Sequence, residues 1–327
     1  MQNVSKIAIP TRPQPDTIVA IFILKTFGKD LFPGIDKAVL EVASKIPETE
    51  TFASMLKKGT LLLDIGGGDL DHHGKNPPVT CAELVCSLFG ISDKPALSKL
   101  LDYVRRDDMS GKGTVSADAL DRAFGLSGLV TALNKIHADD APHVVSTVLP
   151  LIEAHYLEEV KRTEELPREF KEAVEAKKVD TFEVRQRDKK LKVVIIETEN
   201  MSMLGYLRSQ LGGAFDVVVR RSASGHVNIL TRPTKRVDLR SLALVIRLEE
   251  GNKRGAMVKD DPRHLSSAGK LPEVPNWYYD TATNSILNGG SSPKDAEPTV
   301  IDAFTMRKLI QVGLSEQLWS PASTFRR

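Results

Sequence analysis

The sequence predicts an α/β fold made of two domains that a long helix connects. Three observations support this: short apolar segments alternate with helical ones over the first 140 residues, a charge-dense helical stretch follows, and a second series of strands begins near residue 181. A chain of 327 residues, 41% of them hydrophobic, is long enough for two cores. We expect a first domain over 1–140, a helical connector over 141–180 and a smaller α/β domain over 181–327.

The elements expected in the first domain form a parallel sheet flanked by helices. In chain order they are a strand over 5–10, a helix over 16–28, an ambiguous segment over 36–43, a buried strand over 60–65, and helices over 80–89, 97–106 and 116–136. Ligands of such sheets bind at the carboxyl ends of the strands. Asp16 and Asp64 both follow an expected strand, so we expect a site there.

The sequence predicts that the rest of the chain forms one long helix and then a second set of strands and helices. The long helix covers 141–178, with Pro150 and Pro167 as candidate breaks. After it we expect a strand over 190–197, a helix over 202–212, a hairpin of 215–222 with 226–232, a helix over 238–250, a hairpin of 277–280 with 285–290, and a helix over 301–314.

Composition narrows the class of protein. With 45 basic and 43 acidic side chains the net charge is only +2, which does not mark a protein that coats nucleic acid but leaves room for a local basic cleft. The two cysteines, Cys81 and Cys86, suit neither a CxxC metal site nor an easy disulfide, and they fit a reduced interior. We recognise no signal peptide and no transmembrane run, so we expect a cytoplasmic protein without a membrane partner.

Residues 61–75 carry the most informative local pattern. Three leucines indicate a buried strand, Asp64 follows it, and after a run of glycines come Asp71, His72 and His73. Glycine permits positive φ and lets the backbone approach a ligand closely. Carboxylate and imidazole groups gathered at a strand end are the combination that divalent-metal chemistry requires. The alternative is a flexible loop with surface histidines.

The ordered motifs around this segment resemble the DHH phosphoesterase superfamily, which includes RecJ-type nucleases, nanoRNA phosphodiesterases and family II pyrophosphatases. They look most like its MYG-type exonuclease branch. Residues 9–24 are similar to the first motif, in which a strand leads to an aspartate, here Asp16, at the start of an apolar helix. Residues 80–90 are similar to the helix after the DHH triplet, and 102–111 to a later motif that contributes one more metal-binding aspartate.

This resemblance implies a set of site residues. Asp16, Asp64, His72 and one of Asp107 or Asp108 would bind Mn²⁺ or Mg²⁺. Asp71 and His73 would be catalytic, orienting ligands or the charge that develops on the phosphate. Carboxylate and imidazole ligands suit Mn²⁺, and a bound ion lowers the pKa of a water molecule.

The first motif departs from the family pattern. The superfamily usually carries a histidine before the aspartate and often a second aspartate after it, whereas this chain has Arg12 and Gln14 before Asp16 and Ile18 after it. The residues that remain suffice for one ion, and they leave a full two-metal centre open. Arg12 can instead contact a substrate phosphate, since a guanidinium suits bidentate phosphate binding.

The second domain is similar to the DHH-associated substrate domain. That domain has a strand with arginine and serine, represented here by Arg221, and a later glycine-rich segment with a histidine, represented by His264. The glycines before His264 are largely absent, and Arg263 can supply the missing positive charge. The resemblance implies that these three residues bind substrate from across an interdomain cleft. A solvated sheet face is the alternative for the arginines.

The function expected from these observations is a metal-dependent phosphohydrolase that cleaves phosphodiester bonds, with a short single-stranded oligonucleotide or a small nucleotide as substrate. One alternative is a phosphoanhydride hydrolase. Another is a degenerate relative that binds nucleotide or nucleic acid without cleaving it, which the altered first motif favours. The sequence leaves open whether the chain forms a homodimer.

Overall fold

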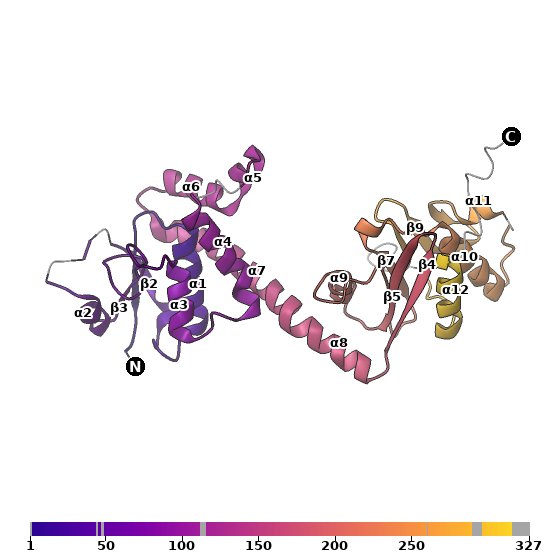
Figure 1. Cartoon of the computed structure of the whole chain (residues 1–327), viewed down its shortest axis with the longest axis horizontal. Coiled ribbons are helices and arrows are strands. Elements are labelled where there is room, and N and C mark those ends of the chain that lie inside the picture. Colours follow the sequence, from indigo (N-terminus) through magenta and orange to yellow (C-terminus); the bar gives the residue numbers. More distant parts are fainter. Residues whose placement is uncertain are drawn as a thin grey trace. The chain divides into compact units, whose positions relative to one another are not determined.

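The computed structural model describes residues 2–43, 45–46, 49–111, 116–259, 261–289 and 296–315. The α/β class is confirmed, and the chain divides into two compact units, Met1–Thr163 and Glu164–Arg327, each with its own sheet (Figure 1). None of the described helices combines the length and the apolar character needed to cross a lipid bilayer.

A three-stranded parallel sheet lies in the first unit, as the sequence predicts. The central strand β1 (Lys6–Ile9) pairs with β2 (Val39–Val42) on one side and β3 (Thr60–Leu62) on the other. The ambiguous segment over 36–43 therefore contains a strand. Because all three strands run in the same direction, the loops after β1 and β3 emerge at the same edge of the sheet.

The first unit contains seven described helices, and four of them pack against α1. The seven helices are α1 (Pro15–Phe27), α2 (Phe52–Lys57), α3 (Cys81–Phe89), α4 (Ser98–Met109), α5 (Ala119–Phe124), α6 (Leu126–Ile136) and α7 (Ala141–Val160), with short 3₁₀ turns η1 (Ile35–Lys37) and η2 (Pro95–Leu97). Residues 15–24 of α1 are all buried, because helices α3, α4, α6 and α7 contact it. Figure 1 shows α1 beside α3 and α4. A helix that is apolar all round needs such cover.

One predicted helix is divided in two. The segment over 116–136 was expected to be continuous, but α5 ends at Phe124 and α6 begins at Leu126. Gly125 lies between them in extended conformation, with φ −65° and ψ 157°, and its N–H donates to the Asp121 carbonyl oxygen. A residue with these angles ends one helix and caps the next.

The expected connector consists of two helices with a turn between them. Helix α7 continues through Pro150 as far as Val160, a π-helical turn η3 covers Lys161–Glu165, and α8 runs over Leu166–Glu175 with Pro167 in its first turn. The boundary between the two units falls within η3. Proline is tolerated in a first turn because the N–H that it lacks would have no helical partner there.

The second unit contains a mixed seven-stranded sheet in the order β4-β5-β6-β7-β10-β9-β8. The strands are β4 (Val179–Gln186), β5 (Lys189–Glu197), β6 (Val217–Arg221), β7 (Val227–Thr231), β8 (Gly269–Leu271), β9 (Val274–Asp280) and β10 (Ser285–Asn288). Only β5 and β6 are parallel neighbours; every other neighbouring pair is antiparallel. Both predicted hairpins, β6–β7 and β9–β10, are present, whereas β4 was not predicted as a strand.

The helices of the second unit are α9 (Ser202–Arg208), α10 (Arg240–Arg254), α11 (Pro262–Leu265) and α12 (Ala303–Ser315), with a 3₁₀ turn η4 (Pro233–Lys235). Helices α10 and α12 pack against each other, and their apolar residues join those of the sheet in one core that includes the fully buried Trp277. A smaller cluster gathers residues of α8 and α9 with those of β5 and β6.

Candidate metal centre

Asp64 lies in a tight loop directly after β3. The residue is 7% exposed, and its φ of +62° falls in the left-handed region, which aspartate tolerates better than most residues. The Asp64 N–H donates to the Leu70 carbonyl oxygen, which closes the loop. Oδ2 accepts a 2.7 Å hydrogen bond from the Thr17 hydroxyl. Oδ1, in contrast, is buried and has no hydrogen-bond partner among the described residues.

Asp16 connects α1 to the start of α3. Oδ2 of Asp16 accepts from the Cys81 N–H at 2.7 Å, and Oδ1 accepts from the Ala82 N–H at 2.9 Å. Burial raises the pKa of Asp16 to about 7, against the opposing effect of these two hydrogen bonds. A carboxylate oxygen has two lone pairs, so each oxygen keeps one for a further partner.

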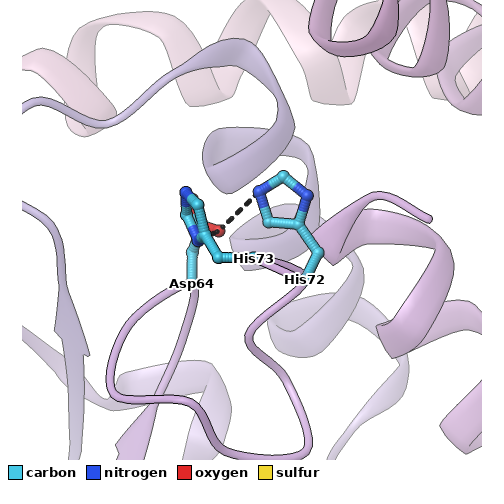
Figure 2. A group of neighbouring side chains, drawn as sticks. All are labelled: Asp64, His72 and His73. Carbon is cyan, nitrogen blue, oxygen red and sulfur yellow. Dashed lines mark ion pairs between the residues drawn. The ribbon is translucent and has the colours of Figure 1, made fainter. Parts of the chain in front are cut away.

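His72 lies beside Asp64. Its Nε2 is 3.1 Å from Asp64 Oδ1 (Figure 2), although the pair does not meet hydrogen-bond geometry. Its Nδ1 is 3.0 Å from the Val79 carbonyl oxygen. The neighbouring Asp64 carboxylate raises the pKa of His72 to about 9, and burial opposes this effect. A ring held at Nδ1 by a backbone carbonyl presents its Nε2 lone pair to a metal when the ring is neutral.

His73 and Asp71 form a pair next to this group. Nδ1 of His73 lies 2.7 Å from Asp71 Oδ1, and the remaining oxygen of Asp71 accepts a 2.7 Å bond from the Gly67 N–H. Burial raises the pKa of Asp71, but its hydrogen bonds from Gly67 and His73 outweigh burial and hold that pKa below its usual value. The His73 side chain is 69% exposed, so the pair combines a fixed carboxylate with an accessible ring.

The two candidate aspartates of α4 have different surroundings. Asp108 Oδ2 lies 3.4 Å from His72 Nδ1. Asp107 is buried on another side of the helix, where it lines a cavity of about 380 Å³ together with Tyr103 and residues of α5 and α6. Successive helical residues point about 100° apart. The structure thus brings Asp108, and not Asp107, to the histidine.

These residues form overlapping groups whose ligand atoms lie within 4.8 Å of one another. The groups are Asp64 with His72 and His73, Asp16 with Asp64 and Cys81, and Asp16 with His72 and Asp108. Carboxylate and imidazole donors fit a divalent cation, and a buried carboxylate oxygen without a partner is an acceptor that a cation would satisfy. The donor set therefore fits the kind of ion that the sequence predicts without identifying it.

Two contacts in this centre were not foreseen. The Thr17 hydroxyl holds Asp64, and the Cys81 thiol donates to the Leu70 carbonyl oxygen at 3.2 Å beside Asp16 and Asp64. The contacts join residues 47 and 11 positions apart, so no motif of a few residues reveals them. The capping box of α3, Thr80 with Glu83, is a local pattern that fixes where this helix starts.

Arg12 and Ile18, which flank Asp16 in sequence, belong to none of these groups. Arg12 is exposed in the loop after β1, and Ile18 is fully buried in the core around α1. Ile18 therefore offers no ligand and packs in the interior.

The candidate substrate residues of the second unit have separate surroundings. Arg221 ends β6, donates to the Ile301 carbonyl oxygen and lines a polar cavity of about 340 Å³ together with Lys178 and Glu197. Arg263 is exposed on α11. His264 Nε2 lies 3.1 Å from Glu273 Oε1. The structure does not gather these three residues into one described group.

Comparison with known proteins adds no family information. No protein-family model matches the chain, and no curated protein matches it. Among solved structures, one that is similar is an uncharacterized protein from Helicobacter pylori G27, at 10% identity over 94% of this chain and 98% of that chain. The TM-score is 0.20, which is too low to support an argument about fold or function.

Proposed function

We propose that this protein is a metal-dependent phosphohydrolase of the DHH type that cleaves phosphodiester bonds in short oligonucleotides or small nucleotides. The observation that carries the proposal is a pair of overlapping groups that share His72, Asp64 with His72 and His73 and Asp16 with His72 and Asp108. In addition, a buried Asp64 oxygen lacks a hydrogen-bond partner among the described residues. Mn²⁺ or Mg²⁺ bound there would supply a Lewis acid that lowers the pKa of a water molecule toward neutrality.

Each residue has a role that follows from its contacts. Asp64 and His72 would hold the ion, and Asp16 would add an oxygen while it anchors α3. Asp108 is the proposed further ligand, through the group that it forms with Asp16 and His72. Asp71 accepts at Nδ1 of His73, which fixes the ring and leaves Nε2 to donate to a phosphate oxygen or to the leaving group. Arg12, Arg221, Arg263 and His264 remain the proposed contacts to substrate phosphate.

The altered first motif favours a second candidate, a relative that binds nucleotide or nucleic acid without cleaving it. Ile18 offers no ligand, and each oxygen of Asp16 accepts a backbone N–H and so has one lone pair left for a cation. These residues favour one ion over two. A centre with a single ion lacks the clamp on attacking and leaving oxygens that two ions provide.

One experiment separates the two candidates. The protein is stripped of metal, and Mn²⁺ is titrated against short oligonucleotides, cyclic dinucleotides, a nucleotide 3′,5′-bisphosphate and pyrophosphate. We expect metal-dependent turnover of a phosphodiester that is lost in His72→Ala and kept in His155→Ala, a matched change at an exposed histidine of α7. Binding without turnover of any substrate would reject the hydrolase and favour the binding protein. Turnover of pyrophosphate alone would assign a phosphoanhydride hydrolase.

A further inference from the structure

A second cavity with positive charge lies in the second unit. Its volume is about 560 Å³, within the roughly 300–1,000 Å³ of small-ligand sites. The described residues that line it come from the end of α9, the segment after β7 and the β9–β10 turn, and they include two arginines and no carboxylate: Arg208, Pro233, Arg236, Val237, Ala282, Thr283 and Asn284.

The cavity and Arg221 lie at opposite ends of strand β6. Strand β6 runs from Val217 to Arg221, and in the antiparallel pairing Val217 lies next to Thr231 at the end of β7. Arg208 donates to the Thr231 carbonyl oxygen, so the cavity belongs to the Thr231 end. Four residues of a strand separate these ends by about 13 Å, so the cavity is distinct from the one that Arg221 lines.

The backbone around this cavity is held in place. Asn284 Nδ2 donates to Thr231 Oγ1 at 3.0 Å and to the Val237 carbonyl oxygen at 2.8 Å, which ties the β9–β10 turn to the segment after β7. Arg208 is fixed by two bonds to carbonyl oxygens, those of Leu204 and Thr231. The site is therefore preorganised, which lowers the entropic cost of binding.

Arg236 supplies a charge that the protein leaves unused. Its side chain is exposed, and it makes no hydrogen bond or ion pair within the part of the chain that the structure describes. The nearby carboxylates have other partners: Asp216 lies 3.8 Å from both Arg232 and Lys235, and Asp280 accepts from Ala282 and Thr283. Lys189 adds a further cation, since its ammonium donates to the Arg236 carbonyl oxygen.

We infer that this cavity binds a phosphate group through Arg208 and Arg236. A planar guanidinium matches the geometry of phosphate oxygens, and the described residues of the lining include no aromatic side chain on which a base could stack. The ligand is therefore recognised by its phosphate and not by its bases. The inference does not rest on the proposed hydrolase activity, because the metal centre contributes no residue to it.

The test measures binding of a fluorescent single-stranded oligonucleotide in EDTA, where no metal-dependent turnover can interfere. Arg236 has φ +46°, a region that favours glycine, so Arg236→Gly removes the charge without adding backbone strain. We expect its Kd to rise about fivefold to tenfold, and the slope of log K against log salt to fall by about 0.7. The matched control is Lys308→Ala, which removes an exposed charge from α12.

Inorganic phosphate serves as the second probe and identifies the source of the phosphate group. Competition by phosphate in the wild type, reduced in Arg236→Gly, would assign the cavity to free phosphate as well as to a nucleic-acid backbone. Oligonucleotide binding that depends on Arg236 without such competition would assign it to the backbone alone. If the Kd and the salt slope of Arg236→Gly equal those of the wild type, and phosphate does not compete, the inference is overturned.

Discussion

Thr17 is the residue on which the position of Asp64 depends. Its hydroxyl donates to Asp64 Oδ2 at 2.7 Å, while the other oxygen of the carboxylate remains available to a cation. A partner of this kind orients a ligand without touching the ion, and its loss typically costs 10–100-fold in metal affinity. Thr17→Val should therefore weaken Mn²⁺ binding by about 10–100-fold with the fold retained, as measured by isothermal titration calorimetry.

The control for this prediction is Thr147→Val, a matched change at an exposed threonine of α7 whose hydroxyl donates to the His143 carbonyl oxygen. It should bind Mn²⁺ as the wild type does. Equal affinities of Thr17→Val and the wild type would show that Asp64 is not a ligand or does not need this hydrogen bond.

His72 makes the stability of the metal-free protein depend on pH. Its pKa is raised to about 9 by the Asp64 carboxylate, so the folded state binds this proton more tightly than the unfolded state. The stabilisation of the folded state by protonated His72 is fully present below the unfolded pKa of about 6.5, and it is lost as pH rises through 9. In EDTA, the free energy of unfolding should fall between pH 7 and pH 10, and this fall should be smaller in His72→Gln.

The window above pH 7 is chosen because of Asp16. Burial raises the pKa of Asp16 to about 7, so between about pH 4 and pH 7 the folded protein keeps a proton that the unfolded chain has lost. The free energy of unfolding therefore falls as pH rises through this range. Urea denaturation above pH 7 largely removes this second contribution. An identical decline in the wild type and His72→Gln would contradict the assignment.

At the scale of elements, the start of α3 joins the fold to the candidate centre. Its first three backbone N–H groups all donate to side chains: those of Cys81 and Ala82 to Asp16, and that of Glu83 to Thr80 Oγ1. Helix N-termini need such acceptors. Asp16 therefore positions α3, and with it the Cys81 thiol, beside Asp64.

This arrangement predicts two unequal losses of stability. Thr80→Ala removes one cap and should lower the free energy of unfolding by about 0.5–2 kcal/mol. Asp16→Ala leaves two buried N–H groups without an acceptor, at about 1–3 kcal/mol for each such group, and should cost more than Thr80→Ala. Urea denaturation of both variants in EDTA measures the difference. An Asp16→Ala protein at least as stable as Thr80→Ala would show that the bonds to α3 contribute little.

The elements that the sequence predicted best are those with a strong local pattern. The apolar run of α1 and the leucines of β3 were found close to their observed bounds, and both hairpins of the second unit were found from their turns. The edge strand β4 was missed because its exposed residues are largely polar or charged. The break at Gly125 was missed because one glycine in an amphipathic pattern does not by itself end a helix.

In the candidate site too, the sequence predicts what a local pattern carries and misses what depends on packing. The order of motifs along the chain predicted Asp16, Asp64 and His72, whereas the choice between Asp107 and Asp108 depends on the rotation of α4 about its axis. Thr17 and Cys81 join the centre only through packing of α1 and α3 around the loop after β3. The interdomain cleft and the substrate contacts of the second unit stay predictions.

At the scale of the whole molecule, the two units have separate apolar cores. One cluster contains only residues of the first unit, such as Ile21 of α1, and the other two contain only residues of the second, such as Ile229 of β7. Because no described cluster spans the boundary near Thr163, damage to one core should leave the other folded. The chain also carries a separate probe for each unit.

The probes are cysteine thiols for the first unit and tryptophan fluorescence for the second. The only cysteines, Cys81 and Cys86, are buried in the first unit, so their reaction with a thiol reagent follows its unfolding. Trp277 is fully buried in the core of the second unit, so its fluorescence follows that unit. The other tryptophan, Trp319, lies outside the described residues.

Ile21→Ala should lower the urea midpoint of thiol exposure, at a cost of about 2–5 kcal/mol, and leave the fluorescence midpoint unchanged. Ile229→Ala should do the reverse, because its cavity opens in the core around Trp277. Ile136→Ala, at a 74% exposed position of α6, should change neither midpoint. If both probes shifted together in either core variant, the two units would unfold as one cooperative body, and contacts between them would contribute a substantial part of the stability.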